Sequence, residues 1–275
     1  MAWKKPTRNL EEMIIDRLKQ GAAMTIDVIA YIRRERPHTT KQGVYAAMRL
    51  LQREEKVAVH GRYASLNTLW IREMLESFSA AQRNYSERSI TDDGFSYLKE
   101  GEKVHYVFRN PILADTFWSH ALLVLTSAVP VEEPLYIYCP HEWFLLAREK
   151  SERALLNSIV DRGRSIRETI GHRDRLDNYI SKEFKREGMK YGTLATPLFK
   201  EKNYYVNIVG GFLVETYLDM RVAEKIDEFY KQTPGWSPSV PAVLGKIIES
   251  PGKTKMTISK NEKRAARLVS LFGKA

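Results

Sequence analysis

The stretch from residue 24 to residue 66, MTIDVIAYIRRERPHTTKQGVYAAMRLLQREEKVAVHGRYASL, decides the fold of the N-terminal part of the chain. Its apolar residues first recur at helical spacing and then, after Lys56, alternate along the chain as they do in a strand. Pro37 separates two helical segments, because a proline disfavours the helical conformation of the residue before it. The pattern therefore predicts two helices joined by a short turn, followed by a β-hairpin that reverses near His60-Gly61.

The second of these helices is predicted to have one buried face and one exposed face. Apolar residues spaced three and four apart form the buried stripe, which consists of Val44, Ala47, Met48 and Leu51. Thr39 or Thr40 can cap the N-terminus of this helix with its hydroxyl group. The outward face and its flanks carry polar, aromatic and basic side chains, namely Lys41, Gln42, Tyr45, Arg49 and Arg53.

A helix-turn-helix followed by a hairpin resembles the winged helix-turn-helix domain of prokaryotic transcription regulators, on the segments TTKQGVYAAMRLL and VAVHGRY. In that family the second helix lies in the major groove of DNA, and the hairpin contacts the backbone or the minor groove. The resemblance implies a DNA-binding set that consists of Thr40, Lys41, Gln42, Tyr45, Arg49, Arg53, His60 and Arg62. A winged helix that binds only other proteins is the alternative, because a fold does not determine a function.

The positive charge of the chain is concentrated at its two ends. The formal net charge is +10; residues 1–70 and residues 246–275 each carry +6, whereas residues 71–245 carry −2. Lys and Arg side chains placed on phosphates release condensed counterions, which favours binding to a polyanion. This segregation indicates a polyanion as the partner of the two basic ends, and with the resemblance to a winged helix we expect double-stranded DNA.

Length and composition indicate a folded chain with more than one domain. With 275 residues, of which 43% are hydrophobic, the chain can bury two cores. Its apolar runs are too short to span a membrane, and no N-terminal segment has the apolar core of a signal peptide. Cys139 is the single cysteine, which excludes an intramolecular disulfide and a cysteine-based zinc cluster. We therefore expect a cytoplasmic protein without membrane association.

We expect an α+β fold with four segments. They are a winged-helix DNA-binding domain (1–66), a linker helix with a polar connector (67–102), a mixed α/β effector or dimerisation domain (103–233), and a linker with a basic C-terminal helix (234–275). In the α/β segment the strands are predicted at 103–109, 135–139, 190–195, 203–209 and 212–218. The helices are predicted at 112–127, 141–160, 175–186 and 220–231.

The linker helix carries an apolar stripe of its own, formed by Ile71, Met74, Leu75 and Phe78. Such a stripe can pair with a second copy of the chain, and packing within the same subunit is the equal alternative. Because a single winged helix reads only a short DNA site, we expect a homodimer.

The C-terminal helix is predicted to follow a proline-rich stretch over residues 234–241. Lys263, Arg264 and Arg267 face away from its apolar side, so they are candidates for a second DNA contact. The alternative is a helix that clasps the partner subunit through Leu268 and Phe272.

Two further stretches of the α/β segment have a functional and a structural interpretation. A cluster of basic residues is a candidate site for a phosphorylated small-molecule effector, namely Arg162, Arg164, Arg167 and His172, although acidic neighbours favour a salt-bridged surface. Cys139 precedes Pro140-His141-Glu142 at the end of a predicted strand, where a thiol near a helix N-terminus can have a lowered pKa. A buried, unreactive cysteine is the favoured interpretation.

No catalytic motif, metal-binding motif or cofactor-binding motif is apparent in the sequence, so we expect a protein that is not an enzyme and has no cofactor. The leading hypothesis is a sequence-specific DNA-binding transcription regulator with a C-terminal ligand-sensing or dimerisation domain. The alternatives are a plasmid or phage replication or partition protein, and a DNA-processing enzyme with a winged-helix targeting module.

Overall fold

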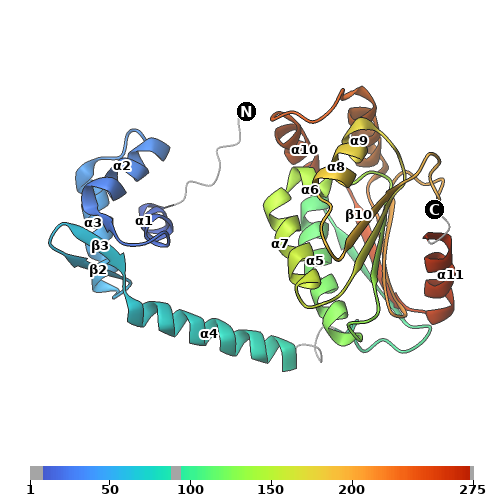
Figure 1. Ribbon diagram of the computed structural model, residues 1–275, viewed down its shortest axis with the longest axis horizontal. Helices are drawn as coiled ribbons and strands as arrows, with labels where there is room; N and C mark the ends of the chain where they lie inside the picture. Colours follow the sequence, from blue (N-terminus) through green and yellow to red (C-terminus); the bar gives the residue numbers. More distant parts are fainter. Residues whose placement is uncertain (1–8, 88–93, 273–275) are drawn as a thin grey trace. The chain divides into compact units, whose positions relative to one another are not determined.

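The computed structural model describes residues 9–87 and 94–272. The chain forms two compact units, divided after residue 88 (Figure 1). This division falls within the connector that the sequence predicts over residues 67–102.

The N-terminal unit consists of three short helices, a small antiparallel sheet and one long helix. Its elements in chain order are α1 (Leu10–Leu18), β1 (Ala23–Met24), α2 (Thr25–Glu35), α3 (Lys41–Arg53), β2 (Val57–His60), β3 (Tyr63–Leu66) and α4 (Thr68–Glu87). The strand order in the sheet is β1-β3-β2. Figure 1 shows the β2–β3 hairpin following α3 directly.

One hydrophobic core joins α1, α2, α3 and the small sheet. The predicted stripe on α3 is buried, and its four residues, Val44, Ala47, Met48 and Leu51, are each exposed by 5% or less. Side-chain caps begin α1 and α3. The Asn9 side chain accepts the backbone N–H of Glu12 at 2.7 Å, and the Thr40 hydroxyl accepts that of Gly43 at 3.0 Å. The helices therefore begin where the capping residues stand in the sequence.

The predicted hairpin is also present. His60 pairs with Tyr63, so Gly61 and Arg62 form its tip. Gly61 has a φ of 59°, a backbone conformation that glycine adopts at little cost. The tip therefore presents the Arg62 side chain to solvent.

The long helix α4 begins at the predicted position. The Asn67 side chain accepts the backbone N–H of Leu69 at 2.9 Å, which caps the helix. Three members of its apolar stripe are exposed, Ile71 by 37%, Leu75 by 63% and Phe78 by 70%. The helix therefore offers an uncovered apolar face.

The second unit is a mixed sheet with helices on both faces. Its elements are β4 (Lys103–Phe108), α5 (Pro111–Ala128), β5 (Leu135–Cys139), α6 (Phe144–Ala147), α7 (Glu149–Val160), β6 (Ile166–Ile170), α8 (Arg175–Glu183), β7 (Met189–Thr193), β8 (Tyr204–Val209), β9 (Phe212–Tyr217), α9 (Met220–Gln232), α10 (Val240–Ile248), β10 (Thr254–Lys260) and α11 (Glu262–Phe272). The strand order is β4-β10-β9-β8-β5-β6-β7. Strands β5, β6 and β7 are parallel, and the other neighbours are antiparallel.

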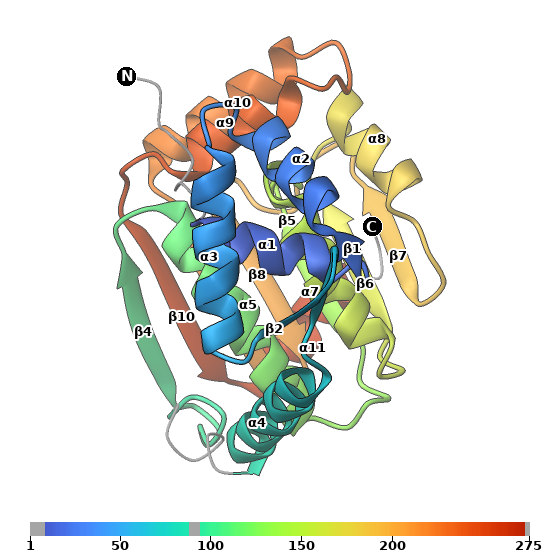
Figure 2. The same ribbon diagram turned by 90° about the vertical axis from the view of Figure 1, so that its left-hand side faces the viewer.

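The two faces of this sheet are covered unequally. Helices α5 to α10 contribute to a large core on one face, whereas α11 packs on the other face through Ala265, Leu268 and Phe272 (Figure 1). Figure 2 shows β4 at one edge of the sheet with β10 beside it, and β6 and β7 towards the opposite edge. The carboxyl ends of the parallel strands β5 and β6 consequently lie next to each other.

The longest helices are α4, with 20 residues, and α5, with 18 residues. Over the described parts of the chain, 9–87 and 94–272, none of the helices combines the length and the apolar sequence that crossing a bilayer requires.

In the second unit two strands were missing from the sequence prediction, and in the N-terminal unit the short strand β1 was missing. Residues 166–170 form β6 inside the sheet, where the sequence predicted a charged surface. Residues 254–260 form β10, which pairs with β4 on one side and with β9 on the other. The basic C-terminal part is therefore not a tail behind a linker, and the boundary predicted at residue 234 is wrong. Its strand completes the sheet, because β4 reaches β9 only through β10.

Two helix boundaries also differ from the prediction. The helix predicted over 141–160 is divided into α6 and α7, and residues 141–143 form a loop before it. The C-terminal helix is capped by Asn261, whose side chain accepts the backbone N–H of Arg264 at 2.8 Å. Residues Ser259 and Lys260, directly before this cap, belong to β10.

Candidate functional site

The N-terminal unit presents an exposed polar and basic surface on α3 and on the hairpin tip. We call this set the α3 surface, and its members are Lys41, Gln42, Tyr45, Arg49, Arg53, His60 and Arg62, all of them exposed. Gln42, Arg49 and Arg53 lie on the side of α3 opposite the buried stripe, and Lys41 and Tyr45 flank this side. His60 and Arg62 belong to the hairpin. The helical period predicted that the α3 members face outward, whereas His60 and Arg62 were assigned from the resemblance to a winged helix.

The cations of the α3 surface lack an acidic partner in the described part of the chain. Among residues 9–87 and 94–272, no carboxylate lies within 4.0 Å of the Lys41, Arg49 or Arg62 charge. Thr40 is exposed as predicted, but its hydroxyl is engaged in capping α3. Unpaired cations on one helix face create a local positive potential, which attracts a polyanion.

A second cluster lies in the α/β unit, beyond the carboxyl ends of β5 and β6. Each strand is followed by a short loop that carries a histidine two residues after the strand ends, His141 after β5 and His172 after β6. Gly171 allows the two loops to meet, because a Cβ atom at this position would lie 2.7 Å from the Tyr138 hydroxyl and 3.2 Å from the Pro140 Cα. Its N–H donates to the Cys139 carbonyl at 2.8 Å. The parallel pairing of the strands therefore brings the two histidines together.

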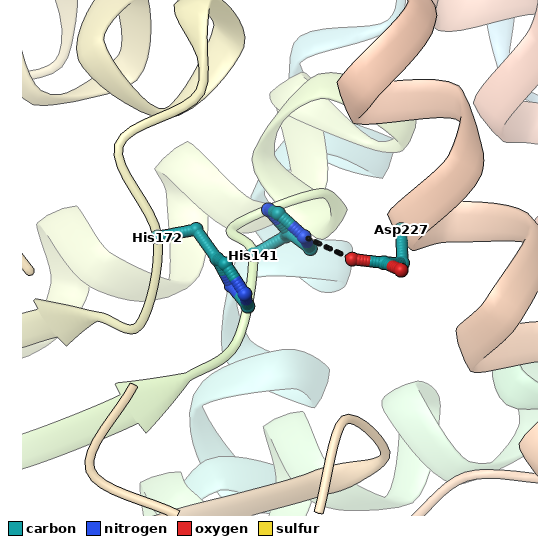
Figure 3. Close-up of side chains that lie close together, drawn as sticks. All are labelled: His141, His172 and Asp227. Atoms are coloured by element: carbon teal, nitrogen blue, oxygen red, sulfur yellow. Dashed lines mark ion pairs between the residues drawn. The ribbon is translucent and has the colours of Figure 1, made fainter. Parts of the chain in front are cut away.

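The two imidazole rings stack, with their centroids 4.3 Å apart and their planes inclined by 14°. Figure 3 shows His141 between His172 and Asp227, a residue of α9. His141 Nδ1 lies 2.9 Å from an Asp177 carboxylate oxygen, and His141 Nε2 lies 3.6 Å from Asp227 Oδ1. His172 donates from Nδ1 to the Pro140 carbonyl at 2.9 Å. We call His141, His172, Asp177 and Asp227 the histidine cluster.

The pKa values of the two carboxyl groups in the histidine cluster are shifted in opposite directions. Burial raises the pKa of Asp177, although its hydrogen bond with His141 opposes this rise. Burial also disfavours the ionised form of Asp227, but hydrogen bonds from Lys202 and Lys231 outweigh it and hold the pKa of Asp227 at about 2. Asp227 is therefore ionised at neutral pH.

A third set of ionisable groups surrounds a cavity of about 50 Å³ inside the α/β unit. Its walls combine aromatic side chains with four carboxyl groups, those of Asp115, Glu142, Glu152 and Glu168. We call these four residues the buried acidic cluster. A cavity of this size holds a few water molecules.

Burial raises the pKa values of all four carboxyl groups in the buried acidic cluster. It raises the pKa of Glu152 to about 9 and that of Asp115 to about 7, and it raises the pKa values of Glu142 and Glu168. Neighbouring carboxyl groups add to the shift of Glu152, since like charges in a dry site disfavour each other. Glu152 is therefore protonated at neutral pH.

Cys139 lies against the buried acidic cluster, with its sulfur 3.6 Å from a Glu142 oxygen and 3.8 Å from a Glu168 oxygen. Burial raises the pKa of its thiol well above the usual value, and the nearby carboxyl groups raise it further. The favoured interpretation from the sequence, a buried cysteine, is confirmed.

The four residues predicted as an effector site have different environments. Arg164 is buried, and its guanidinium group donates to the carbonyls of Thr126, Val129 and Glu133. These carbonyls lie at and beyond the end of α5, where a helix leaves acceptors unsatisfied. Arg164 therefore has a structural role at the end of α5, which the sequence did not predict.

The other three residues of that prediction remain accessible to some degree. Arg162 is exposed and donates to the Ser127 hydroxyl at 3.1 Å. Arg167 is exposed on β6, with its guanidinium 5.6 Å from the centre of the Tyr136 ring. His172 is half-buried and belongs to the histidine cluster.

The basic residues of α11 are also in different environments. Lys263, Arg264 and Arg267 are exposed, and the apolar side of the helix is packed on the sheet of the same chain. Arg264 forms an ion pair with Glu215, a buried residue of β9. Leu268 and Phe272 are therefore not available to clasp a partner subunit.

Sequence reasoning did not identify the histidine cluster as a site. It named His172 in a basic cluster and His141 beside Cys139, but it did not connect the two histidines and gave Asp227 no role. The missing information was β6, because only a strand ending at Ile170 reveals that both histidines stand two residues beyond parallel neighbouring strands. Once both strands are known, this spacing is a signal for a shared site at the sheet edge.

Comparisons with known proteins do not assign the chain to a family. No protein family model matches it, and no curated protein matches its sequence significantly.

Proposed function

We propose that the chain is a sequence-specific DNA-binding transcription regulator that reads DNA with its N-terminal unit. The observation that carries this proposal is the α3 surface, a helix face with unpaired cations opposite a fully buried apolar stripe. The order helix, strand, two helices and hairpin is also that of a winged helix-turn-helix, in which such a helix lies in the major groove. In this proposal α3 reads base edges, and Arg62 at the hairpin tip contacts the backbone.

The first prediction concerns the groove contact. Gln42 and Arg49 point outward from α3 and support no other part of the fold, so replacing either with alanine leaves the fold intact. Loss of a base contact weakens specific binding by about 1–3 kcal/mol. The measurement is fluorescence anisotropy with a duplex selected from random DNA by the parent protein.

Arg72→Ala is the matched control, since Arg72 is an exposed arginine of the same unit that lies on α4. It is expected to bind like the parent. Parent-like affinity of the Gln42→Ala and Arg49→Ala variants for both selected and random duplexes would show that α3 is not the recognition helix.

The second prediction concerns assembly. In the proposed regulator two chains pair through the exposed stripe of α4, so that two N-terminal units read an inverted repeat. A Leu75→Ala/Phe78→Ala double variant removes apolar surface worth about 1.5–3 kcal/mol per side chain on burial. We expect dimer dissociation to increase at least about tenfold in sedimentation velocity.

The control is a Glu73→Ala/Glu76→Ala double variant. These residues lie on the opposite side of α4 by helical period, so the dimer should remain as stable as in the parent. A parent protein that is monomeric both alone and on DNA contradicts the dimer.

A second candidate function is a DNA-processing enzyme that uses the N-terminal unit for targeting. The observation that favours it is the His141–Asp177 pair, since a histidine oriented by a buried carboxylate can act as a general base. A cleavage assay on supercoiled and linear DNA with divalent cations distinguishes the two. Cleavage that a His141→Ala variant loses supports the enzyme, and binding without cleavage supports the regulator.

A further inference from the structure

We propose that the histidine cluster binds a divalent transition-metal ion of the zinc class, with His141, His172 and Asp227 as its protein ligands. The site lies in the α/β unit and is independent of the DNA-binding surface. One nitrogen of each histidine and one oxygen of Asp227 lie within 4.8 Å of one another. Two imidazoles and one carboxylate are a common ligand set for zinc and for other first-row divalent ions.

The hydrogen bonds of both rings prepare them for metal binding. A backbone carbonyl can only accept, so His172 Nδ1 must carry the proton that it donates to Pro140, and Nε2 keeps a lone pair. Asp177 plays the same part for His141, because its carboxylate accepts from Nδ1 and leaves Nε2 free. Metal-binding histidines generally donate their second ring N–H to a carbonyl or a carboxylate in this way.

Unsatisfied atoms point into the same space. Within the described residues neither His141 Nε2 nor Asp227 Oδ1 has a hydrogen-bond partner, although the two residues are exposed by only 2% and 7%. An unpaired buried polar atom is costly, so a ligand that satisfies both atoms is favoured. Their separation of 3.6 Å is too long for a hydrogen bond. Two ligands of a tetrahedral zinc ion are about 3.3 Å apart, so this pair needs to approach only slightly. The stacked His172 ring must in addition turn, because an imidazole binds a metal in the plane of its ring.

The charges around the site determine what kind of binding to expect. Lys202 and Lys231 hold Asp227 Oδ2, at 2.6 Å and 2.9 Å, which orients Oδ1 towards His141. The same two cations repel a metal ion, so we expect reversible binding that is weaker than in a structural zinc site. Asp174 and Asp177 offset part of this repulsion from the opposite side of the His141 ring.

Three protein ligands leave a coordination position open. His172 is half-buried, so this position can be reached from solvent. Water or an anionic small molecule can complete the coordination, as at zinc sites with three protein ligands. The metal would therefore give the α/β unit a ligand-binding centre.

The test uses full-length protein freed of metal by a chelator and titrated with Zn²⁺ by calorimetry and with Co²⁺ by visible absorption. We expect one Co²⁺ per chain, with the absorption of a four- or five-coordinate ion, and no comparable binding of Mg²⁺. His172→Ala and Asp227→Asn should each weaken binding by about 10-fold to 100-fold or more. The exposed His105→Ala is the matched control and should bind like the parent.

Circular dichroism of each metal-free variant shows whether it is folded; if His172→Ala is not, His172→Gln replaces it. Parent-like binding by the folded His172 and Asp227 variants would overturn the proposal. So would binding that only Glu168→Gln abolishes, because the ion would then lie among Cys139, Glu142 and Glu168. Loss in Asp174→Asn but not in Asp227→Asn would place the ion at Nδ1 of His141, which also contradicts the assignment. Absence of binding up to millimolar metal would refute it outright.

Discussion

Truncation of the chain after Lys253 is expected to unfold the α/β unit and to leave the N-terminal unit folded. The deletion removes β10, the strand that joins β4 to β9, and with it α11, which covers one face of the sheet. Met256 and Ile258 of β10 are fully buried in the large core. The N-terminal unit has its own core and does not use these residues. Hydrogen exchange read by mass spectrometry should show protection lost in β5, β8 and β9 and retained in α1 to α3.

Single substitutions in β10 test the same role of the strand through smaller changes in the free energy of unfolding. Ile258→Ala removes buried methyl groups and is expected to reduce the free energy of unfolding by about 2–5 kcal/mol. Lys255→Ala, at an exposed position of the same strand, should change it by no more than about 0.5 kcal/mol. If the truncated chain keeps native protection in β8 and β9, residues 254–272 are dispensable and the assigned sheet order is wrong.

The sequence predicted the N-terminal unit more completely than the α/β unit. The N-terminal unit was predictable because its signals are local. Asn9 and Thr40 cap helices whose apolar stripes follow immediately, and the change of period after Lys56 marks the hairpin. Each signal lies within a few residues of the element that it specifies, so no tertiary information was needed.

Strand β6 could not be recognised from its pattern. Its inward-facing residues are Ile166, Glu168 and Ile170, and the glutamate in the middle interrupts the apolar side. The outward Arg167 continues the basic run before it, so the segment resembled a charged surface. Burial of Glu168 is possible because the other carboxyl groups and the cavity surround it, which are tertiary features.

Strand β10 is a different case, because its alternation was visible. Thr254, Met256 and Ile258 point inward, and Lys255 lies between them on the outside. The prolines at 234–241 led to the interpretation of a linker. In the structure they precede and begin α10, a position at which proline is compatible with a helix. Composition therefore obscured a readable strand.

Stability of the α/β unit is expected to fall as the pH rises from about 5 to about 8, and Glu152 is the residue with the clearest contribution. In the folded protein the pKa of Glu152 is raised from 4.5 to about 9, chiefly by burial. Between pH 4.5 and about pH 9 the Glu152 carboxyl group is ionised in the unfolded chain and protonated in the folded chain. Folding is therefore coupled to the uptake of one proton in this range. The stabilising contribution is therefore complete below about pH 4.5 and is lost as the pH approaches about 9.

Each such proton changes the free energy of unfolding by about 1.4 kcal/mol per pH unit. Glu152→Gln cannot ionise, so its unfolding free energy should depend less steeply on pH, by up to about this slope. Asp115 has a pKa raised to about 7 in the same cluster, so part of the pH dependence of the unfolding free energy is expected to remain in the Glu152→Gln variant. Urea unfolding followed by near-ultraviolet circular dichroism measures the slope, since aromatic side chains line the cavity. Glu149→Gln, an exposed position on the same helix, should keep the parent slope, and an equal slope in Glu152→Gln would show that Glu152 is ionised in the folded protein.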